Sequence, residues 1–129
     1  MTKWTTEELS RIEAADELEV APVRHDGTLH RPVPIWVVRD GDDLYVRSYR
    51  GAEGSWYRTA RTNGTGHVRS GGVDMDITFV AEPDSGVNDR VDAAYRAKYS
   101  RYGGSYVKAM VASGARGTTL KLLPRWPRP

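Results

Sequence analysis

The strongest constraint on the fold is a predicted β-hairpin that turns at Gly71-Gly72. Two adjacent glycines supply the positive φ angles that a tight two-residue turn requires. After the turn, residues 73–80 alternate apolar and polar side chains, as expected for a strand with one buried face. Pairing through this turn places complementary side chains opposite one another: Val68 and Met75 inside, and Arg69 with Asp74 and His67 with Asp76 outside. The segment therefore predicts an antiparallel, half-buried pair of strands.

A second hairpin is predicted, with its turn at Asp40-Gly41 and its strands at residues 35–39 and 44–50. The two-residue period of a strand puts four apolar residues on the face expected to form the core: Ile35, Val37, Leu44 and Val46. Ser48 and Arg50 continue this face beyond its apolar part. The core face of the second strand is therefore expected to end in polar donors.

Helices are predicted near both ends of the chain. Thr5 and Glu8 form an expected capping box, with Trp4 packed on Leu9, so a helix should run to about residue 15. In the last third, spacings of four, four and three residues predict an amphipathic helix with an apolar and tyrosine stripe: Val91, Tyr95, Tyr99 and Tyr102. Gly103-Gly104 should end that helix, and a short helix is expected at 105–111.

Two further strands are expected at residues 18–23 and 118–123, and Pro32 and Pro34 restrict the strand around them to a sheet edge or a late start. With about six strands, three or four helices and mostly hairpin connections, the chain should form an antiparallel sheet or barrel with appended helices. This is a mainly β fold of the α+β class. We expect one domain over residues 1–124, with its later helices at about 88–112, followed by a tail at 125–129.

The composition excludes several classes of protein. A chain of 129 residues can bury a core of its own, and the absence of cysteine rules out disulfide frameworks and thiolate metal sites. No stretch approaches the roughly 20 apolar residues of a membrane span, and the N-terminus lacks the apolar segment of a signal peptide. We therefore expect a soluble, cytoplasmic protein with no membrane partner. The net charge of +2 is spread along the chain, which argues against a nucleic-acid partner.

Catalytic and metal-binding motifs are sparse. The three histidines, His25, His30 and His67, lack the spacing of metal ligands, and no phosphate-binding glycine motif follows a predicted strand. Residues 51–54 have the Gly-x-x-Gly form of an RNA-clamping loop, but Glu53 would repel phosphate. We predict no metal site and assign no catalytic residue.

The segment after the second hairpin is the main candidate site. Arg47, Ser48 and Arg50 offer donors at a strand end, beside a glycine loop that permits close backbone approach, and Trp56 can cover a flat ring. These are suitable parts for binding an aromatic cofactor that carries a phosphate. The alternative is structural: the arginines pair with acids such as Glu53, and Trp56 packs under the loop.

Three segments, RPVPIWVVRDGDDLYVRS, RGAEGSWYR and HVRSGG, resemble the pattern of flavin-reductase-like and deazaflavin-dependent nitroreductase split barrels. The WTxEEL start, the AxELE segment and the AAYRxKYxRYG helix resemble an uncharacterised family of small bacterial proteins within that group. The resemblance implies a six-stranded, FMN-binding-like split β-barrel that forms a homodimer, with FMN or deazaflavin near the subunit interface. By position it implies that Ser48, Tyr49, Arg50 and Gly51 hold the cofactor phosphates, beside a helix start with Trp56, Tyr57 and Arg58. Upstream, residues 25–31 replace the phosphate motif that is typical of the group.

Two functions follow as hypotheses. The first is a flavin- or deazaflavin-binding oxidoreductase that acts on a small molecule, in which the cofactor supplies the redox chemistry. The second is a non-catalytic small-ligand-binding or stress-associated protein that keeps the barrel without the cofactor, so the sequence leaves open whether the chain is an enzyme. We also expect a homodimer that buries Trp36 and Tyr45, which lie on the strand face opposite the core residues.

Overall fold

A computed structural model describes residues 3–125, so most of the predicted tail lies outside the described part. The helices are α1 (Thr6–Ala14), α2 (Ser55–Asn63), α3 (Ser85–Tyr99), α4 (Gly104–Val111) and α5 (Ser113–Arg116), with short 3-10 helices η1 (Gly51–Glu53) and η2 (Ser100–Tyr102). The strands are β1 (Leu18–Pro22), β2 (Val33–Ile35), β3 (Val38–Asp40), β4 (Asp43–Val46), β5 (Thr65–Ser70), β6 (Val73–Ala81) and β7 (Leu120–Pro124).

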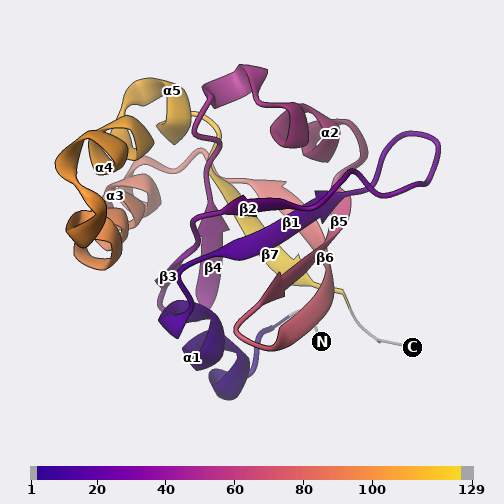
Figure 1. The fold of residues 1–129 in the computed structure, drawn as a ribbon, viewed down its shortest axis with the longest axis horizontal. Helices are drawn as coiled ribbons and strands as arrows, with labels where there is room; N and C mark the ends of the chain where they lie inside the picture. Colours follow the sequence, from indigo (N-terminus) through magenta and orange to yellow (C-terminus); the bar gives the residue numbers. More distant parts are fainter. Residues whose placement is uncertain (1–2, 126–129) are drawn as a thin grey trace.

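Over the described residues, seven strands form one antiparallel sheet in the order β2-β1-β5-β6-β7-β4-β3. Strands β2 and β3 are separated in the chain only by Trp36 and Val37, yet they lie at opposite edges of the sheet. The sheet therefore has to curl until its two edges approach. Figure 1 shows this half-barrel, with α3 and α4 beside it, α1 at one end and α2 at the other.

The sequence-based prediction of the central hairpin is confirmed. In the β5–β6 pair, Arg69 lies opposite Asp74 and His67 opposite Asp76, and the turn glycines have φ angles of +57° and +82°. The capping box is confirmed as well, since the Thr5 hydroxyl accepts from the Glu8 amide at 3.1 Å and Glu8 Oε1 accepts from the Thr5 amide. Local turn and cap chemistry determines these elements.

The predicted strands of the other hairpin are partly wrong. Ile35 belongs to β2, where it pairs with Leu18, and the hairpin strand β3 starts only at Val38. The second strand, expected to reach residue 50, ends at Val46 because the β7 strand beside it begins at Leu120, directly opposite. The sheet thus has seven strands in place of about six, and residues 47–50 lie beyond the end of β4.

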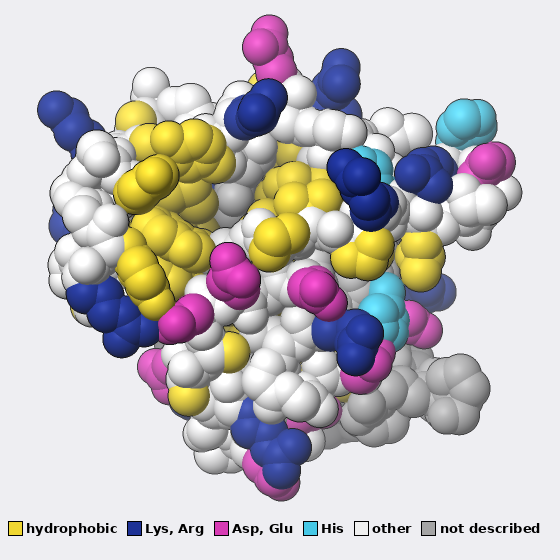
Figure 2. Space-filling model, in the orientation of Figure 1, with side chains coloured by type: hydrophobic (Ala, Val, Ile, Leu, Met, Phe, Trp, Pro, Cys, Tyr) yellow, Lys and Arg dark blue, Asp and Glu magenta, His cyan; other side chains and the backbone are white. Residues whose placement is uncertain are grey.

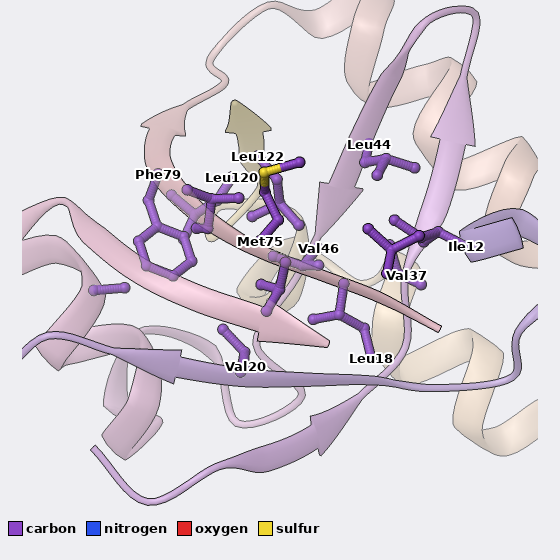
Figure 3. Packing of buried hydrophobic residues seen from close by; sticks show 14 of the residues in the cluster. Ile12, Leu18, Val20, Val37, Leu44, Val46, Met75, Phe79, Leu120 and Leu122 are labelled. Carbon is purple, nitrogen blue, oxygen red and sulfur yellow. The ribbon is translucent and has the colours of Figure 1, made fainter. Parts of the chain in front are cut away.

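Two clusters of buried side chains hold the described residues together. The larger one fills the inside of the curled sheet and is closed by residues of α1 and α2 (Figure 3). Trp4 belongs to it and also donates from Nε1 to the Leu122 carbonyl at 2.8 Å. The smaller cluster lies on the other face of β3 and β4, under α3 and α4.

This second cluster corrects the predicted reason for dimerisation. Tyr45 is only 2% exposed, because Tyr95 and Tyr99 of α3 pack against its face of the sheet. Trp36 is half-buried and stacks on Tyr99, with ring centroids 4.0 Å apart. The chain's own helices cover the face that was expected to require a second subunit.

Candidate functional site

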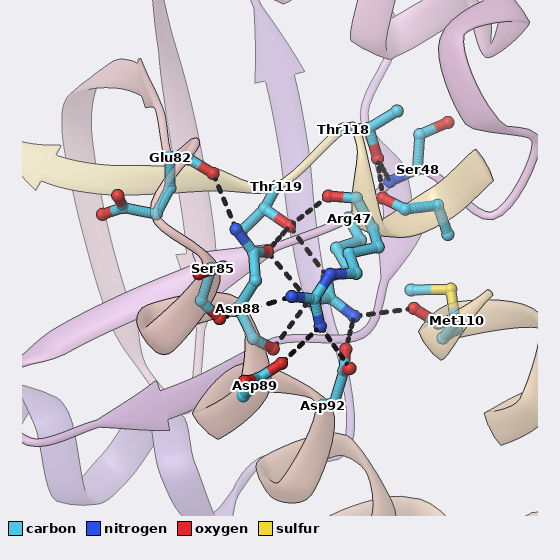
Figure 4. A network of polar contacts seen from close by, with 12 residues as sticks. Arg47, Ser48, Glu82, Ser85, Asn88, Asp89, Asp92, Met110, Thr118 and Thr119 are labelled. Carbon is cyan, nitrogen blue, oxygen red and sulfur yellow. Dashed lines mark hydrogen bonds and ion pairs between the residues drawn. The ribbon is translucent and has the colours of Figure 1, made fainter. Parts of the chain in front are cut away.

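Arg47 leaves the end of β4 and is completely buried, with 0% exposure. Its guanidinium donates to Asp92 Oδ1 at 2.5 Å, to Thr119 Oγ1 at 2.9 Å and to the Met110 carbonyl at 2.9 Å (Figure 4). The backbone carbonyl and side-chain oxygen of Asn88 accept two further bonds, at 3.2 and 3.0 Å. All five guanidinium donors thus have acceptors, as a buried cation requires.

The partners of Arg47 come from separate elements. Asn88 and Asp92 lie on α3, Met110 on α4 and Thr119 just before β7. Asp92 is shared, since its Oδ2 accepts from Arg116 at 2.6 Å. The network therefore fixes the helices α3 and α4 to the end of β4, and with them the position of the next residue in the chain, Ser48.

Ser48 begins one wall of a cleft of about 1150 Å³ between the sheet edge, α2 and α4. The described residues that line it include Arg24, His30, Arg31, Trp36, Tyr49, Arg50, Glu53, Gly54, Ser55, Trp56, Arg58, Tyr102, Tyr106 and Met110. Figure 2 shows hydrophobic side chains gathered where α3 and α4 approach the β2 end of the sheet, next to a hollow with basic side chains near its edge. The cleft thus has an aromatic part and a basic part.

The hydroxyl of Ser48 is buried without a hydrogen-bond partner among residues 3–125. Ser48 as a whole is 1% exposed, while its backbone amide donates to Thr118 Oγ1 at 2.8 Å. A Cβ atom built on Gly54 would clash with Ser48 Oγ, so glycine is needed at that position. A buried polar group without a partner is unfavourable by about 1–3 kcal/mol, which makes Ser48 a candidate ligand contact.

The N-terminal end of α2 forms the neighbouring wall. Its N-cap, Gly54, has no side chain, so no side-chain cap satisfies the first backbone N–H groups of the helix. Gly54, Ser55 and Trp56 all line the cleft. Free N–H groups and the positive end of the helix dipole favour an anion at this position.

Three arginines in the cleft wall have no partner for their guanidinium groups within the described chain: Arg31, Arg50 and Arg58. Arg24, by contrast, donates to the Leu29 carbonyl at 2.7 Å. Glu17 and Glu53 are the acids that line the cleft in the described residues. Because Arg47 is neutralised by Asp92, the three unpaired arginines dominate the charge of the cleft and favour an anionic ligand.

Aromatic side chains form the opposite part of the cleft. Tyr49 and Tyr106 are 58% and 55% exposed, and their ring centroids lie 6.4 Å apart. Trp36 and Tyr102 form a second pair at 6.0 Å. Such surfaces can accept a flat ring at low entropic cost, since their own side chains have few rotatable bonds.

Buried titratable groups support the aromatic wall from behind. The Tyr99 hydroxyl donates to the Asp16 carbonyl at 2.8 Å and accepts from the Val37 amide at 3.1 Å. Burial raises the pKa of Tyr99 above its ordinary value, so the phenol stays neutral. Burial also lowers the pKa of the neighbouring Lys98 to about 8, although its Nζ donates to the Val37 carbonyl at 2.8 Å.

Five of the seven residues predicted for the cofactor lie together in the wall of this cleft: Ser48, Tyr49, Arg50, Trp56 and Arg58. Two do not. Gly51 is buried with φ +67° and packs on the backbone of Gly114, so its role is to turn the chain. Tyr57 is a core residue, 6% exposed, whose hydroxyl accepts from Arg61. For all seven residues, the role in cofactor binding remains a prediction.

The structural alternative is borne out in part: Trp56 is 6% exposed and packs in the larger cluster, and Arg47 pairs with an acid, although that acid is not Glu53. Arg47 binds Asp92, 45 positions away, and neither Arg47 nor Arg50 forms an ion pair with Glu53. The sequence reasoning also missed His30, Arg31 and Ser55 as wall residues. The only sign of the first two was their position in the segment 25–31, where the related split barrels carry a phosphate motif.

Within residues 3–125, no group of three or more histidine, aspartate or glutamate side chains is placed to hold a metal ion. No helix of the described chain is long and apolar enough to cross a membrane.

Solved structures with the same fold carry different ligands in their names. HutZ, the haem storage protein of Vibrio cholerae, superposes with a TM-score of 0.68 and 14% identity, covering 97% of this chain and 92% of its own. An F420-H2 dependent reductase, FDR-A, superposes with a TM-score of 0.62 and 16% identity, covering 83% of this chain and 93% of its own. An FAD-binding protein of Mesorhizobium loti superposes with a TM-score of 0.58 and 16% identity, covering 98% of this chain and 92% of its own. At these identities the likeness shows the fold, which confirms the predicted flavin-reductase-like split barrel.

No curated protein matches the sequence significantly. One family does, and its match extends over residues 8–122, which is nearly the whole domain and includes the complete cleft wall. The chain therefore belongs to DUF2255, a family of uncharacterised proteins conserved in bacteria.

Proposed function

We propose that the cleft binds a flavin-type cofactor, FMN or a deazaflavin, and that the protein is an oxidoreductase of a small molecule. The observation that carries the proposal is the buried, unpartnered hydroxyl of Ser48 beside the uncapped end of α2. A phosphate oxygen can accept from this hydroxyl and from the backbone N–H groups of the helix. Because Gly54 has no Cβ, the Ser48 hydroxyl can lie directly against the N-cap of α2.

The remaining wall residues fit the same group. Arg50 and Arg58 can bind phosphate by charge-assisted hydrogen bonds, and the exposed rings of Tyr49 and Tyr106 offer surfaces for a cofactor ring. Trp56 is only 6% exposed and belongs to the larger buried cluster, so it supports the wall from behind. When bound, such a cofactor would supply the hydride chemistry, while the chain would bind and orient it. The F420- and FAD-related names among proteins of the same fold support this class of cofactor.

The second candidate is a non-catalytic small-ligand-binding protein, favoured by the similarity to a haem storage protein. Against haem, both ring nitrogens of His30, the histidine in the cleft wall, are already hydrogen-bonded, to the Arg31 carbonyl and to Ser55. Iron coordination would require one of these bonds to break. The two candidates differ in whether a bound cofactor is reduced and reoxidised.

Thermal shift with FMN, FAD, deazaflavin and haem tests the proposal. A ligand present at about 100 times its Kd stabilises the folded state by about 2.7 kcal/mol. For a domain of this size, the melting temperature should rise by roughly 8 to 13 °C. The absorption spectrum of the purified protein provides an independent test, since a retained flavin or deazaflavin absorbs in the near ultraviolet or blue.

Arg50→Ala tests the phosphate contact. Loss of charge-assisted bonds should weaken cofactor binding by about 1.5 to 3 kcal/mol, or roughly tenfold to a hundredfold, while the melting temperature without ligand stays nearly constant. Arg96→Ala is the matched control, because Arg96 is exposed on α3 and does not line the cleft. No shift from any of the four compounds, or an unchanged affinity in Arg50→Ala, would contradict the proposal.

We also propose that the protein is a cytoplasmic homodimer. A structure of the same fold is named as a domain-swapped dimer, which supports the assembly, and the absence of cysteine suits a reducing compartment. Tyr102 and Tyr106 are exposed in the cleft wall, so a second subunit that covers them would also close over the cleft. Light scattering of the eluting protein at tens of micromolar should give twice the monomer mass, and a monomer mass would refute the dimer.

A further inference from the structure

His30 and Ser55, which the proposed cofactor does not require, form a directed hydrogen-bond chain in the cleft. His30 Nδ1 lies 2.7 Å from the Arg31 carbonyl, and His30 Nε2 lies 3.1 Å from Ser55 Oγ. A carbonyl oxygen can only accept, so the proton of the neutral ring is on Nδ1. Nε2 therefore carries the lone pair, and the Ser55 hydroxyl donates to it.

This order of groups is the one that activates a serine nucleophile. The hydroxyl points its proton at a base, and a third group, the Arg31 carbonyl, fixes the ring and its tautomer. His30 is half-buried and Ser55 is exposed, so a substrate in the cleft can reach the hydroxyl.

The surroundings of Ser55 can stabilise negative charge. Ser55 is the first residue of α2, whose initial backbone N–H groups have no side-chain cap. Donors of this kind stabilise the oxyanion that forms when a hydroxyl attacks a carbonyl. The unpartnered hydroxyl of Ser48, 1% exposed and against the N-cap Gly54, is an independent sign that this end of the cleft receives a polar ligand.

We propose that Ser55 and His30 are a nucleophile and general base that hydrolyse small activated esters carrying an anionic group. Preference for an anion follows from two unpaired guanidinium groups of the cleft wall. Arg58 lies three residues after Ser55, on the same side of α2, and Arg31 follows His30. This activity goes beyond the proposed cofactor binding and does not require a cofactor, but it uses the same N–H groups of α2 and Arg58, so a bound cofactor phosphate would compete with the ester.

The steps balance without any co-reactant except water. Ser55 Oγ bonds to the ester carbonyl carbon while His30 Nε2 takes the hydroxyl proton. The tetrahedral intermediate then expels the alcohol, which receives that proton, and leaves an acyl group on Ser55. Water attacks the acyl group, His30 takes one proton of the water, and release of the acid returns the proton to Ser55.

Covalent labelling of the whole purified protein tests the nucleophile. A fluorophosphonate probe should modify Ser55 in peptide mass mapping, and p-nitrophenyl esters should release one burst of p-nitrophenol per protomer. Ser55→Ala should abolish both signals, whereas Ser10→Ala, an exposed serine on α1, should change neither. Absence of label on Ser55 in the folded wild-type protein, or a burst that survives Ser55→Ala, would overturn the proposal.

His30→Gln separates catalysis from a tethering role. Glutamine can still hydrogen-bond Ser55 but cannot take its proton, so acylation should be at least about a hundredfold slower at an unchanged melting temperature. Arg58→Ala should lower the preference for mono-p-nitrophenyl succinate over p-nitrophenyl acetate about tenfold, and Arg96→Ala should not. Equal labelling rates in wild type and His30→Gln would show that His30 only tethers the loop.

Discussion

Removing the negative charge of Asp92 should destabilise the protein far more than removing an exposed charge. In Asp92→Asn, the buried Arg47 guanidinium loses its only charged partner in the described chain and keeps neutral acceptors alone. Breaking a buried pair in this way costs about 3–5 kcal/mol, because an uncompensated charge stays inside. For 129 residues, this corresponds to a fall in melting temperature of roughly 10 to 20 °C.

Urea unfolding followed by circular dichroism measures this difference. The control is Glu7→Gln, which removes one partner of the exposed pair of Arg11 and Glu7 and should change the unfolding free energy by less than about 0.5 kcal/mol. The double variant Arg47→Met with Asp92→Leu should cost less than the sum of its single changes, by up to about 3 kcal/mol, since no charge is left alone. A cost below about 1 kcal/mol for Asp92→Asn would refute the reasoning.

Three smaller predictions concern single groups. Ser48→Ala removes a buried hydroxyl without a partner, so the unfolding free energy should rise by about 1 kcal/mol in calorimetry while cofactor affinity falls; a large loss of stability would contradict the assignment. The pKa of Lys98 is about 8 in the fold and about 10.4 when unfolded, so the unfolded chain binds more protons between these values. Stability should therefore rise with pH across that window in urea titrations, and Lys98→Met should remove Lys98's part of the rise. Trp4→Phe removes the donor to the Leu122 carbonyl and should cost about 0.5–1.5 kcal/mol plus lost packing, with Trp4→Ala costing clearly more.

The parts of the fold that the sequence predicts are those determined by neighbouring residues. The Gly71-Gly72 turn defines the register of β5 and β6, and the capping box defines the start of α1. The apolar and tyrosine spacing also predicts which side of α3 is buried, since Val91, Tyr95 and Tyr99 are completely covered, but it is wrong for Tyr102, which lies beyond α3 in η2 and is 41% exposed. In each case, the deciding contacts lie within a single helix or hairpin.

The candidate site could be predicted only in part from the sequence, because its contacts join distant segments. From the sequence, Arg47 is expected to bind a ligand or a nearby acid such as Glu53, but its acceptors lie 41 to 72 positions away. His30 and Ser55 are 25 positions apart, and Tyr106 reaches the same cleft from α4. No period or turn in the sequence encodes these separations, so only the donor-rich strand end could be identified.

The contrast between two adjacent residues explains how the cleft is held ready for a ligand. Arg47 has five acceptors and is fixed among α3, α4 and β7, whereas the hydroxyl of Ser48 has none among the described residues. The network and the bond from the Ser48 amide to Thr118 Oγ1 fix the backbone at the strand end, next to the unsatisfied hydroxyl. A ligand oxygen that binds Ser48 thus gains a hydrogen bond without reordering the backbone, and less binding free energy is lost to ordering. The stability of the Arg47 network and the affinity of the cleft should therefore fall together.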